Sequence, residues 1–180
     1  MNLEDYHGEK PKKLEKLDEE FLKELDYLVS KVTSSFNEYQ YSFSKADTEK
    51  IFWKDFADNY IEAVKGRIYN QTGDKKISAQ YTLYKSLLII LKLFSPIIPF
   101  VTEEIYQTYF RKKEKDKSIH ISNWPGSSKK AALSKDFRFF CDFLSKIRYE
   151  KTKAQKSMNS EIILTLSKEN IKALKNMKED

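Results

Sequence analysis

The sequence predicts a mostly α-helical protein, an antiparallel helical bundle followed by a small, truncated α/β appendage. Apolar residues recur at intervals of three and four over long stretches, which is the period of an amphipathic helix. Only 4 glycines and 4 prolines occur among the 180 residues, so few positions interrupt a helix. A short run of β-favouring residues at 162–166 is the exception, and it predicts the appendage.

The first two helices are predicted from their apolar spacing. The spacing indicates one helix over residues 21–39 and a second over residues 51–64, with Ser42 or Ser44 as the N-terminal cap of the second. The turn-forming residues 70–74 include a glycine that can adopt a positive φ, so we expect the second helix to end there.

Two prolines separate the third predicted helix, residues 76–94, from the fourth, residues 100–112. Pro96 and Pro99 lack an amide proton and push the preceding residue out of the helical region, so the chain must turn between them. The hydroxyl of Thr102 is a candidate cap for the fourth helix; if that helix begins earlier, Pro99 suits its first turn. This corner is predicted to orient two helices of the bundle.

The C-terminal third changes pattern. After a charged loop at 111–117, residues 119–122 alternate as a short strand or extended segment, and a fifth helix is predicted over 134–156. A strand at 162–166 and a last helix at 168–177 follow. Since a lone strand leaves its edge groups unpaired, we expect an incomplete subdomain.

The domain organisation predicted from these elements has three parts. Residues 1–13 form a tail, residues 14–130 the helical bundle, and residues 131–180 a helix-strand-helix subdomain. A chain of 180 residues can bury a substantial core without further staples.

Composition narrows the function classes. One cysteine, Cys141, and two histidines, His7 and His120, exclude a disulfide framework within the chain and a zinc-ligand cluster, and they fit a reducing, cytoplasmic setting. The apolar run at 87–94 is far shorter than the roughly 20 residues of a membrane span. A net charge of +6 with 33 lysines and arginines favours a polyanionic partner, although a solvated helical surface has the same composition.

Three motifs carry a family resemblance. Residues 87–106 read LLIILKLFSPIIPFVTEEIY, residues 118–125 read SIHISNWP, and residues 52–62 read FWKDFADNYIE. Together they resemble the anticodon-binding domain of class I aminoacyl-tRNA synthetases. The segments 147–151 and 156–162 are more similar to the valyl enzymes of this family than to the isoleucyl ones.

The resemblance implies binding of a tRNA anticodon stem-loop, in support of ATP-dependent attachment of valine to its tRNA. The expected partners are valine-accepting tRNA and the catalytic and editing domains of a longer parent chain, with no membrane or DNA partner. The family's HIGH and KMSKS signatures are absent, and KSMNS at 156–160 has the wrong order and position. We therefore expect no catalytic residue, metal or cofactor in this chain; ATP and Mg²⁺ would belong to the parent's catalytic domain.

Two alternatives stay open at this stage. The same module of an isoleucyl-tRNA synthetase would bind a different tRNA. A helical interaction protein would have no RNA role, although both ends of the chain look truncated, which argues against it.

The candidate RNA contacts combine cations with an aromatic ring, as binding to phosphates and unstacked bases requires. Lys146, Tyr149, Lys153 and Lys156 recur at intervals of three and four on the fifth predicted helix. The adjoining stripe and the second helix complete the predicted set with Arg148, Lys151 and Arg67. A solvated face, with the tyrosine covering the bundle, is the alternative interpretation. The aromatic residues Trp53, Phe56 and Tyr60 share one helical face and are predicted to pack in the core.

Overall fold

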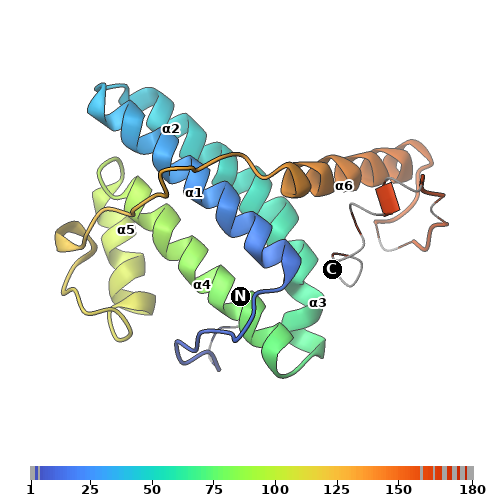
Figure 1. Cartoon of the computed structure of the whole chain (residues 1–180), viewed down its shortest axis with the longest axis horizontal. Coiled ribbons are helices and arrows are strands. Elements are labelled where there is room, and N and C mark those ends of the chain that lie inside the picture. Colours follow the sequence, from blue (N-terminus) through green and yellow to red (C-terminus); the bar gives the residue numbers. More distant parts are fainter. Residues whose placement is uncertain are drawn as a thin grey trace.

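A computed structural model describes residue 3 and residues 5–158, 160–163, 165–167, 170, 171, 174 and 177. Its elements are helical throughout the described residues (Figure 1). In order they are α1 (Lys16–Asn37), α2 (Tyr41–Lys50), the π-helix η1 (Ile51–Ile61), α3 (Glu62–Asn70), α4 (Asp74–Phe94), α5 (Pro99–Ile105), the π-helix η2 (Tyr106–Phe110), the 3-10 helix η3 (Ile119–Ile121) and α6 (Lys135–Lys153).

The helices run up and down as an antiparallel bundle, which confirms the predicted bundle. The predicted α/β appendage is not seen, because the described residues form no strand. The rod formed by α2, η1 and α3 returns alongside α1, and α4 lies beside both (Figure 1). The core between them is aromatic: the ring of Phe21 on α1 stacks on Tyr60 of η1 at 4.3 Å between centroids and on Phe56 at 5.8 Å. Phe137 of α6 contacts the same Phe21 ring, so α6 shares this core.

The turn between α1 and α2 differs from the prediction. Tyr39 takes a φ of 59°, and the amide of Gln40 donates to the carbonyl of Ser35 at 2.8 Å, so α2 begins at Tyr41. Neither Ser42 nor Ser44 caps it. Ser44 is buried, and its hydroxyl donates to the Gln40 carbonyl one turn earlier. The end of α1 is closed by backbone hydrogen bonds from the amides of Tyr39 and Gln40.

The double-proline corner has the predicted position and one of the two predicted starts. The third predicted helix ends at Phe94, whose carbonyl accepts hydrogen bonds from the amides of Ile97 and Ile98. The next helix begins with Pro99 in its first turn, and Thr102 is not its cap. The buried Thr102 hydroxyl instead donates to the Ile98 and Pro99 carbonyls, both at 3.0 Å.

The predicted strands are wrong wherever the structure describes their residues. Residues 119–121 form a 3-10 turn capped by Ser118, whose hydroxyl accepts from the His120 amide. Residues 162, 163, 165 and 166 are not in a strand, and residue 164 is outside the description. Ile163 is 99% exposed, and a strand without a partner strand has nothing to pair its backbone. The predicted helix at 168–177 lies mostly outside the described residues.

Two further findings concern burial. Cys141 lies in the core, and burial raises the pKa of its thiol to about 12. Trp53 was predicted to pack in the core with Phe56 and Tyr60, yet its side chain is 63% exposed. None of the described helices is long and apolar enough to cross a membrane.

Candidate nucleic-acid interface

Helix α6 is held to the bundle at its N-terminal end by polar contacts with α1. The hydroxyl of Ser134 caps α6 by accepting from the Phe137 amide, and it donates to Glu20 at 2.7 Å. The amide of Ser134 donates to Glu24 at 3.1 Å. These buried bonds fix where α6 starts and in which direction it leaves the bundle (Figure 1).

Two arginines extend this attachment along α6. Arg138 forms ion pairs with Glu24 and with Asp55 of η1. Ten residues later, Arg148 donates to the side-chain oxygen of Asn59 and to the carbonyl of Asp58, both at 2.8 Å. Arg148 therefore orients the middle of α6 against η1, and its guanidinium is already occupied in part.

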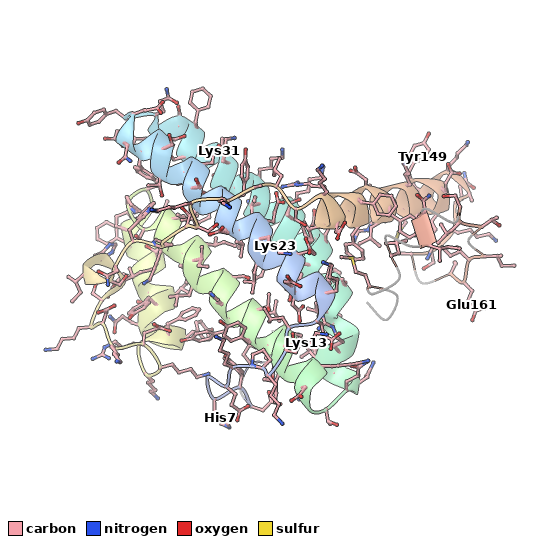
Figure 2. The ribbon with its side chains drawn as sticks, viewed as in Figure 1. His7, Lys13, Lys23, Lys31, Tyr149 and Glu161 are labelled. Carbon is pink, nitrogen blue, oxygen red and sulfur yellow. The ribbon has the colours of Figure 1, made fainter. Side chains whose placement is uncertain are left out.

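Three lysines at the C-terminal end of α6 carry cations without a partner among the described residues. Lys146 and Lys153 lie on α6, which ends three residues before the predicted position 156, and Lys156 lies just beyond that end. All three are exposed, and their ammonium groups make no ion pair or hydrogen bond with any residue that the structure describes. Tyr149 is 65% exposed and lies on the edge of α6 that faces away from the trailing segment (Figure 2). These three ammonium groups and the exposed ring, at and just beyond the C-terminal end of α6, can contact phosphates and a nucleobase.

Lys151 differs from its neighbours on the same helix. Its ammonium group donates to the carbonyl of Met158, and the side chain is only partly exposed. The contact holds the segment after α6 back against the helix. The Lys151 ammonium group is therefore occupied within the chain, whereas those of Lys146 and Lys153 have no partner among the described residues.

Arg67 is separated from the other predicted contacts. It is 2% exposed, and its two terminal nitrogens donate to the carboxylate of Asp18 at 2.8 and 2.7 Å. Asp18 also accepts from Tyr60 and Ser78, so this cluster joins α1, η1, α3 and α4. Burial, with the Asp18 charge beside it, raises the pKa of Tyr60 well above its ordinary value. The Arg67 guanidinium therefore faces the core and not a surface that RNA could reach.

A groove of about 740 Å³ lies between α6 and the segment after it. Its apolar walls include Phe139, Phe143 and Ile147 on α6 and Ile162 and Leu166 opposite, with Lys146 and Lys156 at its rim. Among the described residues there is no cluster of histidine, cysteine and acidic side chains that could hold a metal ion.

Trp53 is an exposed aromatic residue, although its helical spacing with Phe56 and Tyr60 predicts a place in the core. Its ring meets Phe52 edge-on at 4.7 Å, while the Lys50 and Lys54 side chains beside it are exposed. The signal in the sequence was the pair of lysines, because a tryptophan between two cations suits solvent better than a core. The regular spacing of the aromatic residues points to the core more strongly than the two lysines point to solvent.

Residues 18–175 match the family described as the anticodon-binding domain of tRNA ligase. The chain belongs to this family, and the match runs from the start of α1 through α6. This confirms the resemblance carried by the proline corner and by η1.

The relatives are valine-tRNA ligases. That of Ehrlichia ruminantium is 36% identical over 163 residues, which are 87% of this chain and 20% of that protein. That of Pyrococcus horikoshii is 32% identical over 121 residues, 67% of this chain and 14% of that protein. That of Orientia tsutsugamushi is 40% identical over 106 residues, 58% of this chain and 12% of that protein. The chain thus spans a fifth or less of the length of these relatives.

Proposed function

We propose that this chain binds the anticodon stem-loop of valine-accepting tRNA as the anticodon-binding part of a valine-tRNA ligase. The observation that carries the proposal is the group of exposed lysines at and just after the C-terminal end of α6, Lys146, Lys153 and Lys156, with the exposed Tyr149 between them in sequence, on a bundle of this family. Their ammonium groups have no partner among the described residues. Membership of the family favours tRNA as the polyanion, and the names of the relatives favour valine.

The remaining parts of the reaction would lie elsewhere in a longer polypeptide. Activation of valine with ATP, and the Mg²⁺ that accompanies ATP, would be the work of a catalytic domain, and an editing domain would be a further partner. This chain alone would then bind tRNA in the cytoplasm without ligase activity. Its contribution is to hold the tRNA in a fixed orientation.

Electrostatics determine how the binding should behave. Each lysine that neutralises a phosphate releases a counterion, so log affinity falls with log salt by about 0.7 to 0.9 per phosphate contacted. Three lysines without an ion-pair partner among the described residues, at and just after the end of α6, therefore predict a steep salt dependence. Tyr149 would contribute little to that slope, because stacking involves no counterion.

The test is a titration of the chain with valine tRNA at several salt concentrations. Alanine at Lys146, Lys153 and Lys156 together should weaken binding and reduce the slope of log affinity against log salt by about 2 to 3. Alanine at Lys112, Lys115 and Lys117 is the matched control, since it removes the same charge from the loop between η2 and η3.

The outcomes separate the hypotheses. Absence of tRNA binding at low salt would overturn the RNA function altogether. Equal effects of the two triple variants would show that charge alone, and not the α6 face, attracts the tRNA. Equal affinity for isoleucine and valine tRNA would contradict the assignment to valine.

A further inference from the structure

Trp53 lies on the solvent side of the rod formed by α2, η1 and α3, and its surroundings are polar. The side chain is 63% exposed, and the charged residues Lys50, Lys54 and Asp58 near it in sequence are exposed too. A single ring among charged groups is not the contiguous apolar patch that a protein partner requires. Its surroundings suit a flat ligand that carries negative charge.

The Trp53 ring packs against Phe52, which packs against the aromatic core. Phe52 meets Trp53 edge-on at 4.7 Å between centroids, and Phe52 is packed in turn against Phe94 of α4 at 6.2 Å and Phe56 at 6.4 Å. A fixed aromatic ring loses little conformational entropy when a second ring stacks on it. One edge of Trp53 is therefore supported by the core, while most of its surface remains open.

The cations beside Trp53 are free, unlike those at the ends of the same rod. Lys45 pairs with Glu49 at 3.4 Å, and Lys65 pairs with Glu62 at 2.7 Å. Lys50 and Lys54, between them in sequence, form no ion pair or hydrogen bond through their ammonium groups with the part of the chain that the structure describes. Of the acids near Trp53 in sequence, Glu49 is paired with Lys45 and the buried Asp55 with Arg138, which leaves Asp58. Two lysines against one aspartate give the exposed surface here a net positive charge.

A short chain of hydrogen bonds joins this position to the proposed interface on α6. The side-chain amide of Asn59 donates to the carbonyl of Lys54 at 2.9 Å, and its oxygen accepts from Arg148 at 2.8 Å. The η1 backbone at Lys54 is therefore fixed relative to α6 through Asn59 and Arg148. An RNA that contacts both elements would meet them in a fixed relative position.

We propose that Trp53 is a stacking platform for an unpaired nucleobase of the bound RNA, with Lys50 and Lys54 contacting the phosphates on either side. This inference rests on the proposed function and assigns it a second contact surface, on η1. An indole face stacks on any base, while the lysines neutralise the backbone. The ligand is a loop nucleotide and not a paired one, because both faces of a paired base are already stacked in a helix.

The fluorescence of Trp53 provides a test that leaves the residue intact. The chain has two tryptophans, and replacing Trp124, whose ring nitrogen donates to Thr33, by phenylalanine leaves Trp53 as the only indole. In this W124F background we expect an RNA hairpin with the anticodon loop of valine tRNA to quench Trp53 emission. A blunt RNA duplex of the same length should bind at low salt without that quenching.

Substitution gives an independent measurement. W53A should weaken hairpin binding by about tenfold, the effect of losing one base stack, while leaving the salt slope unchanged. W53F should retain most of the affinity. Tyr109→Ala is the matched control, because Tyr109 is a comparably exposed ring, 69%, on η2.

The results distinguish this inference from the proposed function. If the hairpin binds and the α6 lysines determine the slope, yet Trp53 is not quenched and W53A binds like the wild type, only the stacking platform is overturned. If the chain binds no RNA at low salt, both proposals fail. Emission from Trp53 that changes with protein concentration in the absence of RNA would indicate self-association through this face and overturn the inference.

Discussion

Arg67 and Asp18 form a bidentate ion pair in the interior, with the arginine 2% exposed and the aspartate fully buried. The two residues are 49 positions apart in sequence, and the pair links α3 to the first turn of α1. Tyr60 and Ser78 donate to the remaining positions on the carboxylate. The carboxylate is thus surrounded by donors from three other helices, which is the condition under which a buried charge is tolerated.

Arg67→Ala should reduce the free energy of unfolding by about 3 to 5 kcal/mol, because it leaves the Asp18 carboxylate buried without a counter-charge. Urea denaturation measures this difference. Lys65→Ala, which removes an exposed ion pair from the same helix, is the control and should change stability little. An R67A variant as stable as the wild type would contradict the structural role assigned here.

We expect the attachment of α6 through Glu20 to weaken at acidic pH. Burial alone would raise its pKa, but hydrogen bonds from Lys16, Ser134 and Lys23 outweigh burial and lower the pKa to about 2, from an ordinary value of 4.5. A carboxyl whose pKa is lower in the folded state stabilises the fold above pH 4.5. That contribution is lost as the pH falls from about 4.5 toward 2.

The free energy of unfolding, measured by urea denaturation between pH 6 and pH 2, should therefore fall with a contribution from Glu20 of at most about 1.4 kcal/mol per pH unit. Glu20→Gln should remove that contribution and flatten the profile. Glu49→Gln, at an exposed ion pair, should not. Identical profiles for E20Q and wild type would show that Glu20 does not anchor α6.

We expect Asp55 to give the opposite dependence of stability on pH. Burial and the neighbouring Glu24 charge raise its pKa, and Arg138 offsets only part of this. Arg138, whose nitrogen lies 3.0 Å from the carboxylate, is the one polar partner of Asp55 among the described residues, and it is shared with Glu24. A raised carboxyl pKa means that the folded state prefers the protonated form, so stability decreases as the pH rises through the interval above the ordinary value of 3.8.

Asp55→Asn should consequently stabilise the chain at neutral pH by about 1 kcal/mol or more, since it removes a buried charge that Arg138, shared with Glu24, offsets only in part. The gain should shrink on acidification, when the wild-type carboxyl is itself protonated. Thermal or urea unfolding at neutral and acidic pH measures both values. A destabilised D55N variant at neutral pH would show that the pair with Arg138 outweighs the cost of burial.

The substitution Arg148→Lys tests whether Arg148 acts by orienting α6 or by its positive charge. Lysine keeps the positive charge but cannot make both hydrogen bonds to Asn59 and to the Asp58 carbonyl. We expect a loss of about 1 kcal/mol in the free energy of unfolding. We also expect weaker tRNA binding with an unchanged salt slope, because the phosphate-binding lysines remain. A reduced slope in R148K would mean that Arg148 itself binds a phosphate.

The local sequence pattern was sufficient to predict most of the helices and the family. The period of apolar residues predicted α1, η1, α4 and α6, and the missing amide protons of Pro96 and Pro99 predicted the corner where α4 ends. These features depend on residues within one or two turns of each other. The same reasoning predicted strands at 119–122 and 162–166, because a short alternating or β-branched run looks alike whether or not a partner strand exists.

Long-range contacts decided which side chains are free. Arg67 and Lys146 look equally basic in the sequence, yet Asp18, which lies far from Arg67 along the chain, buries Arg67, and no described residue pairs with Lys146. Trp53 and Tyr60 look equally fit for a core, but only Tyr60 meets Phe21 and Asp18. The sequence by itself determined the helices and the family, because helix formation and proline breaks are local. Only the tertiary structure decided which cations and rings remain available for a partner, because burial and charge pairing depend on residues that folding brings together.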